Sequence, residues 1–160
     1  APLLRSTLAL NGCNNVTVVQ AAATDVKGES FLHAPIIQNG IGVLFGSSHL
    51  TGEAKGIRVK TQPLDDYAGD ADFDFVKIDA EGAELLVWRG MKRSLKNPRI
   101  VVLMEFAPHG READALGLLA DIERQGFPLC RVDTAGRIEP VTKEQAMKEP
   151  WQMLWLERGR

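Results

Sequence analysis

Cysteine is scarce in this sequence, because only Cys13 and Cys130 occur among its 160 residues. Two thiols so far apart suit neither a zinc framework nor a disulfide-rich secreted fold, so we expect free thiols and a cytoplasmic protein. A surplus of positive charge is also missing, since 19 Lys and Arg stand against 21 Asp and Glu, a formal net charge of −2. No broad positive field attracts nucleic acid or an anionic membrane, and we expect neither as a partner.

Long apolar runs are absent as well. No stretch approaches the roughly 18 apolar residues of a membrane helix, and no basic start followed by an apolar run opens the chain. The sequence nevertheless contains 44% hydrophobic residues, which is enough for a packed core. The length predicts a single domain over residues 1–160.

The first third of the chain carries weak patterns. Leucines at helical spacing before Asn11-Gly12 predict a short opening helix, and the β-branched run 16–19 predicts a buried strand that leads to Thr24-Asp25. Residues 35–56 lack periodicity and predict an irregular excursion with weak strands. Alternation over 56–61 predicts a half-exposed strand.

Stronger patterns begin at residue 73. The alternating run 73–78 predicts a strand, and apolar residues at helical spacing up to Leu95 predict a helix after it. The continuous apolar run 100–104 predicts a central parallel strand covered on both faces. A further helix ending near Gly126 and strands near 129–132 and 153–156 complete a parallel, doubly wound α/β sheet with helices on both faces.

Acidic residues follow two of these strands. In a doubly wound sheet ligands bind outside the carboxyl ends of the strands, so Asp79, Glu81 and Glu105 are candidate site residues. Asp79 and Glu105 suit orientation or deprotonation of a hydroxyl, and His109, on the loop after Glu105, is a third candidate base. Structural roles stay open: Asp79 as a helix cap, Glu81 and Glu84 as first-turn acids, and His109 as a surface residue.

Other chemistries fit these residues less well. Asp79, Glu81, Glu105 and His109 offer ligands for a divalent cation, but their spacing matches no known metal motif, so we predict no metal site. Phosphatases of the haloacid-dehalogenase type begin with Asp-x-Asp, whereas this chain has Glu81 at the second position. No Gly-x-Gly-x-x-Gly follows any predicted strand, which disfavours a dinucleotide dehydrogenase.

The block Phe73-Asp-Phe-Val-Lys-Ile-Asp-Ala-Glu-Gly-Ala-Glu84 closely resembles the signature of the FkbM family of S-adenosylmethionine-dependent methyltransferases. The resemblance spans about residues 3–107 and is most specific over 77–84. Further parts in register are Leu8 to Gly12, Asn15-Val16, Ala21-Ala22, Asp25, Gly28, Leu64 to Asp66, Gly90 and Glu105.

This resemblance implies a Rossmann-like class I methyltransferase fold with strand order 3-2-1-4-5-7-6, in which run 16–19 is the third strand. It implies S-adenosylmethionine as cofactor and a hydroxyl acceptor on a small molecule or sugar. Thr24 and Asp25 correspond to the adenine side of the pocket. Asp79, Ala80 and Glu81 correspond to further cofactor contacts, and Asp79 and Glu105 to the acceptor side.

The chain departs from the family pattern at one point, because the glycine-rich loop and the first two strands have no counterpart in it. We therefore expect an N-terminally truncated domain whose strand 73–78 has an exposed edge, open to self-association. The alternative function is that of an incomplete, non-catalytic methyltransferase fold acting as a binding module.

Overall fold

The computed structural model describes residues 1–33, 43–45, 56–68 and 72–159. Apart from residues 43–45 and 56, the predicted irregular excursion lies outside this part. The elements in chain order are α1 (Pro2–Leu10), β1 (Ala22–Ala23), β2 (Gly28–His33), β3 (Val43–Phe45), β4 (Ile57–Gln62), α2 (Asp65–Ala68), β5 (Phe75–Ile78), α3 (Glu84–Arg89), the 3-10 helix η1 (Ser94–Lys96), β6 (Val101–Phe106), α4 (Glu112–Arg124), β7 (Cys130–Val132), β8 (Ile138–Pro140), α5 (Lys143–Lys148) and β9 (Gln152–Glu157).

A five-stranded sheet in the order β5-β6-β9-β7-β8 forms the larger half of the molecule. Only β5 and β6 run parallel, whereas β9 is antiparallel to both β6 and β7. The order β5-β6-β9-β7 agrees with the last four positions of the strand order that the family resemblance implies. Within the described residues β5 has a ladder partner on one side alone.

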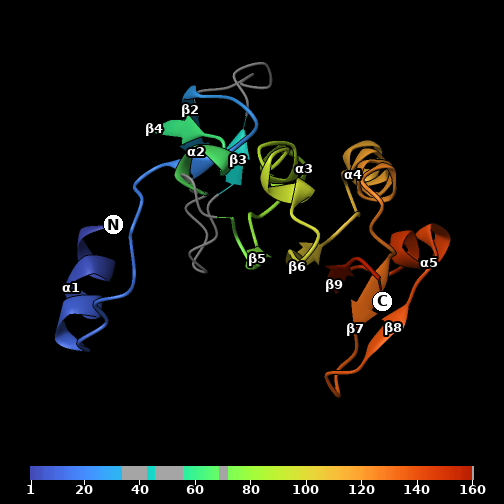
Figure 1. Cartoon of the computed structure of the whole chain (residues 1–160). Coiled ribbons are helices and arrows are strands. Elements are labelled where there is room, and N and C mark those ends of the chain that lie inside the picture. The colour runs from blue at the N-terminus through green and yellow to red at the C-terminus, as the bar shows by residue number, and fades with distance from the viewer. Residues whose placement is uncertain (34–42, 46–55, 69–71, 160) are drawn as a thin grey trace.

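Helices α3 and α4 lie on one face of this sheet, and α5 packs against α4 (Figure 1). Side chains alternate accordingly: Val102, Met104 and Leu154 are buried against the helices, while their neighbours along each strand are half-exposed. We call the other side the open face. It carries Phe75, Lys77 and Asp79 of the β5 strand and its end, Leu103 and Glu105 of β6, and Met153 and Trp155 of β9.

The prediction of a parallel sheet with helices on both faces is therefore wrong for the described part of this sheet. Residues 100–104 form a run of apolar side chains, but Val101 and Leu103 face outward and are only half-buried. A run of apolar residues does not distinguish a strand covered on both sides from one whose second face carries apolar side chains in the open.

The core lies between the sheet and its helices. Trp88 of α3 is almost completely buried and meets Phe127 edge-on, with ring centroids 5.5 Å apart. The guanidinium of Arg158 lies 3.9 Å above the Phe127 ring and donates hydrogen bonds to the backbone oxygens of Asn97 and Gln125. Arg158, just after β9, is thus hydrogen-bonded to the turns that follow η1 and α4.

A second sheet, in the order β1-β4-β2-β3, precedes the larger one in sequence. β1 is parallel to β4, and β2 is antiparallel to β4 and β3. The predicted strand at 16–19 is not formed. Its valines belong to no strand ladder, Val16 is 49% exposed, and the first strand is the two-residue β1 instead. A β-branched run forms a strand only where a neighbouring strand offers hydrogen bonds.

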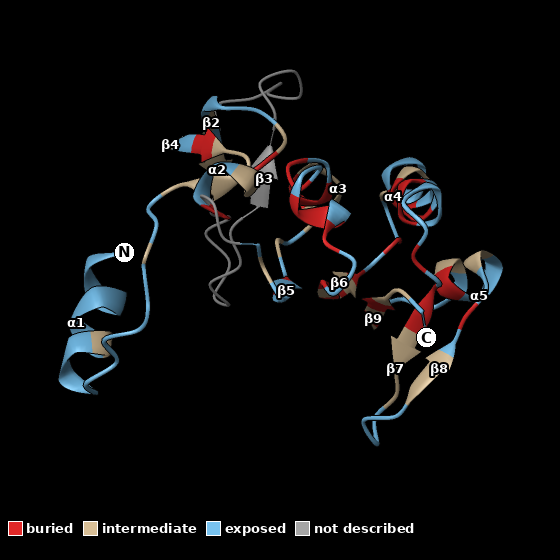
Figure 2. Ribbon diagram, in the orientation of Figure 1, coloured by how far each residue is buried: buried red, intermediate tan, exposed pale blue. Residues whose placement is uncertain are grey.

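Helix α1 lies away from the five-stranded sheet and is joined to β1 by segment 11–21, which begins with turns (Figure 1). Leu4 of α1 lines a hollow together with Leu32 of β2 and Ile57 of β4. No residue of α1 is buried, and nearly all of the helix has the colour of exposed residues in Figure 2. Across the described residues no helix combines the length and apolar character that crossing a bilayer requires.

Candidate active site

The turn after β5 has an uncommon backbone conformation. Glu81 has a φ of 49° and Gly82 a φ of 97°, so consecutive residues lie in the left-handed region. Such a φ is uncommon for a residue with a side chain and is found preferentially at functional sites. Glu84 stabilises the turn, because its Oε1 accepts hydrogen bonds from the backbone N–H groups of Ala80 at 3.1 Å and Gly82 at 2.9 Å. Glu84 therefore has a structural role here.

Three carboxylates meet beside this turn, and we call them the acid cluster: Asp79, Glu81 and Glu105. One oxygen atom from each lies within 4.8 Å of the others. Asp79 follows β5 and Glu105 lies near the end of β6, and these parallel neighbours bring both side chains to one edge of the open face. The structure thus brings together three acids that the sequence placed at strand ends.

Two further side chains orient the acid cluster. The Lys77 Nζ lies 2.6 Å from Asp79 Oδ2 and donates a hydrogen bond to it. The indole N–H of Trp151 donates a hydrogen bond to Glu105 Oε1. Sequence reasoning missed both residues. Lys77 could have been found, because residues two apart on an alternating strand, such as Lys77 and Asp79, lie on the same face. Trp151 comes from a distant part of the chain, and no local pattern connects it to Glu105.

The pKa values of Asp79 and Glu105 are shifted in opposite directions. The hydrogen bond from Lys77 lowers the pKa of Asp79 below its usual value. Partial burial raises the pKa of Glu105, opposed by the Trp151 hydrogen bond and reinforced by the negative charge of Asp79. Of these two neighbouring acids, Glu105 therefore binds a proton more strongly than Asp79 does.

Asp79 does not cap the following helix. α3 begins at Glu84, its N-cap is Ala83, and no side chain makes a cap hydrogen bond there. The Asp79 carboxylate is instead engaged with Lys77 on the open face. The alternative of a helix cap is therefore excluded, and the Asp79 side chain remains half-exposed.

The other predicted site residues lie elsewhere. His109 is exposed on the loop between β6 and α4 and is not part of the acid cluster. Thr24 is buried, its Oγ1 donating to the Val26 oxygen at 2.8 Å and its N–H to the Gln62 oxygen at 3.1 Å. Asp25 is half-buried beside it.

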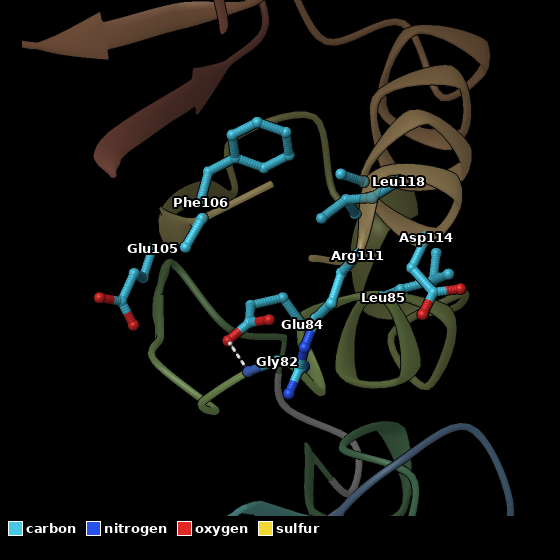
Figure 3. A pocket seen from close by; sticks show the side chains of 10 residues that line it. Gly82, Glu84, Leu85, Glu105, Phe106, Arg111, Asp114 and Leu118 are labelled. Atoms are coloured by element: carbon cyan, nitrogen blue, oxygen red, sulfur yellow. Dashed lines mark hydrogen bonds between the residues drawn. The ribbon is translucent and has the colours of Figure 1, made fainter. Parts of the chain in front are cut away.

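A small cavity of about 20 Å³ opens between the turn after β5 and the start of α4 (Figure 3). Its walls include Gly82, Glu105, Arg111 and Leu118. The guanidinium of Arg111 lies against Gly82, in the space that a side chain at position 82 would need. The cavity has room for about one water molecule.

The Methyltransferase FkbM domain matches residues 1–129 of the chain. This chain belongs to the FkbM methyltransferase family. The FkbM match contains the whole acid cluster, the turn after β5 and helices α3 and α4, whereas β7, β8, α5, β9 and Trp151 lie beyond its last residue. No curated protein and no solved structure matches the chain.

Proposed function

We propose that this FkbM chain is an S-adenosylmethionine-dependent methyltransferase that methylates a hydroxyl group on a small molecule or sugar. The observation that carries the proposal is the acid cluster, which lies at the carboxyl end of the parallel pair β5 and β6 inside the family match. Methyl transfer to oxygen needs an aligned acceptor and a group that takes its proton, and carboxylates supply both.

The opposite tuning of the two carboxyls suggests distinct roles. Asp79, kept ionised by Lys77, is a weak base and suits acceptance of a hydrogen bond that orients the acceptor hydroxyl. Glu105 has the raised pKa, so its ionised form is the stronger base near neutral pH and suits removal of the hydroxyl proton. Trp151 and Lys77 are positioning residues in this proposal.

The cavity beside the acid cluster does not fit the complete cofactor. The acid cluster complements a positive sulfonium, but the cavity beside it, about 20 Å³, is the size of a water molecule. We therefore derive no step through S-adenosylmethionine and expect the 160-residue chain to bind it weakly. Titration calorimetry measures this affinity, and micromolar binding would contradict the expectation.

Transfer of a labelled methyl group tests the activity. At saturating S-adenosylmethionine, with a panel of monosaccharides and hydroxylated small molecules, the chain should yield a labelled ether product. Glu105→Gln should lower the rate by about 10²–10⁴-fold, as expected for loss of a general base. Asp79→Asn should lower it by about 10²–10³-fold, as for loss of one positioned polar group. Lys92→Gln is the control and should leave the rate unchanged.

The second candidate function is a non-catalytic binding module, and the small cavity is the observation that favours it. Under this alternative no product forms at any cofactor concentration, yet a hydroxylated ligand still binds at the acid cluster. Nuclear magnetic resonance titration of the Trp151 indole N–H signal with the same panel distinguishes the two functions, because that proton contacts Glu105 directly.

A further inference from the structure

The open face of the five-stranded sheet is apolar along its middle. Phe75 at one edge is 51% exposed, and its ring centroid lies 6.2 Å from that of Trp155. Leu103 lies between them, since it pairs with Lys77 on one side and Trp155 on the other. In the described part of the chain no helix covers these side chains. An aromatic and aliphatic surface of this kind marks an interaction site.

Helix α1 has apolar side chains that are exposed to solvent. Leu3 and Leu10 are seven residues apart, on the same side of the helix, and are 81% and 88% exposed. A helix of nine residues is only marginally stable in water unless one face packs against something. Leu4 lines a hollow together with Val18 and Leu32, whereas no described part of the chain covers Leu3 and Leu10. These two leucines therefore need an apolar surface from elsewhere.

Electrostatics match the helix to the open face. Residues 1–10 contain Arg5 as their one charged side chain and no acid. The open face carries the carboxylates of Asp79, Glu105 and Glu157, and Lys77 as its cation in the described strands. Charges of opposite sign favour the approach of the two surfaces and guide their orientation.

We propose that α1 of each molecule packs on the open face of a second copy of this chain, which forms a twofold-symmetric dimer with exchanged helices. A second copy is favoured over the same molecule because α1 lies away from its own five-stranded sheet (Figure 1). Arg5 holds the helix there by donating a hydrogen bond to the Val18 oxygen at 3.0 Å. Reciprocal exchange gives two identical contacts and closes the assembly at two chains. The inference does not depend on catalysis.

Light scattering after size exclusion tests the assembly. The unaltered chain should elute as a dimer, and both the double variant Leu3→Ser/Leu10→Ser and the single variant Phe75→Ser should elute as monomers. Leu116→Ser is the matched control: Leu116 is also 50% exposed, but it lies on α4, away from the open face, and this variant should remain a dimer. Circular dichroism confirms that each variant is folded.

A disulfide trap identifies which molecule supplies the helix. Cys13 is exposed just after α1, so Phe75→Cys places a second thiol on the open face within reach of a docked α1. Mild oxidation should give a dimer band on a non-reducing gel, and Phe75→Cys combined with Cys13→Ser should not. A monomeric unaltered chain, a dimer that survives Leu3→Ser/Leu10→Ser, or a disulfide formed within one molecule would each overturn the proposal.

Discussion

At the scale of single residues, two carboxyls of the acid cluster, Asp79 and Glu105, lie in different environments. Lys77, Asp79 and Glu105 share the open face, and the two carboxyls are tuned apart by a hydrogen-bonding cation on one and partial burial on the other. Such opposed environments are how proteins give two chemically similar acids different protonation states. Two predictions test this tuning without any need for turnover.

Lys77→Met should raise the pKa of Asp79. The hydrogen bond from Lys77 is the largest cause of its lowered value, so removal of the ammonium removes the main stabilisation of the carboxylate. Carboxyl carbon titration by nuclear magnetic resonance measures the change. Lys96→Met, at the end of η1, removes a cation elsewhere and should leave the pKa of Asp79 where it was. An unchanged titration in Lys77→Met would show that the ion pair is not populated.

Glu105→Gln should change how stability depends on pH. A folded-state pKa above 4.5 gives wild-type stability that is complete below the unfolded pKa and is lost as pH rises through the folded pKa. The amide of this variant does not ionise and retains an oxygen for the Trp151 indole N–H. The free energy of unfolding of the variant, relative to wild type, should therefore increase as pH rises from about 4.5 towards neutrality.

Glu112→Gln provides a control of opposite sign. Hydrogen bonds from its own backbone N–H and that of Gly110 lower the pKa of Glu112, so the ionised side chain stabilises the folded state above the unfolded pKa and that stability is lost on acidification. Relative to wild type, this variant should lose stability as pH rises. Urea denaturation over a pH series measures both slopes, and parallel slopes in the two variants would contradict the assigned shifts.

Site residues were predictable from the sequence where a local pattern connects them, and unpredictable where they come from distant parts of the chain. Asp79, Glu81 and Glu105 were predictable because strand ends in a parallel pair meet at one edge. Trp151 was not, because β9 inserts beside β6 from the far end of the chain and only the tertiary pairing reveals it. His109 has the chemistry of a general base, but the loop that carries it leaves the ring exposed outside the acid cluster.

At the scale of elements, one glycine determines how the smaller sheet meets the larger half. Gly90 ends α3, and a Cβ there would overlap the carbonyl oxygen of Thr24 and press on Pro63. Its carbonyl also accepts the Asp65 N–H at 3.1 Å. The turns after β1 and β4 thus pack directly against backbone at the end of α3.

Gly90→Ala should destabilise the protein by about 1–3 kcal/mol, the usual cost of overpacking. Its φ of −78° suits any residue, so the cost is one of space alone. Gly117→Ala, inside α4, is the matched control: the nearest atom to a Cβ there is Cδ2 of Leu85 on α3, 3.9 Å away, and the helix should gain about 0.5–1 kcal/mol. Denaturant unfolding measures both, and equal stability of the two variants would contradict this packing.

Elements with strong periodicity were predictable, and those that depend on a neighbour were not. The helix ending near Gly126 and the strands at 57–62 and 152–157 were predicted within a few residues because their apolar spacing is regular. Residues 16–19 have strand composition but lack a ladder partner. α5 was missed although Thr142 and Gln145 form a reciprocal capping box, a signal that the sequence does contain.

At the scale of the whole molecule, stability is concentrated between the five-stranded sheet and its helices. Trp88 is 2% exposed, contacts Phe127 and belongs to the cluster of buried side chains that joins β5, β6, β9, α3 and α4. By contrast α1 has no buried residue. Among the described residues, the packed core therefore lies in the larger half of the molecule, and α1 is peripheral to it.

Trp88→Ala should lower the free energy of unfolding by about 3–5 kcal/mol, because a buried aromatic side chain is lost and a cavity remains. Leu116→Ala, at a half-exposed position of α4, should cost less than half as much. Thermal unfolding followed by circular dichroism compares the two variants. A similar loss of stability in both would show that the core is not centred on Trp88.

The position of β9 in the middle of the larger sheet sets the order in which this protein can be built. β9 is synthesised after both β6 and β7, yet it lies between them in the sheet and hydrogen-bonds to both. While β9 is still inside the ribosome, β6 and β7 each have one edge without a ladder partner. Domains commonly begin to fold during synthesis, but this sheet closes only after β9 has left the ribosome, and until then the cell must keep those edges from pairing with other chains.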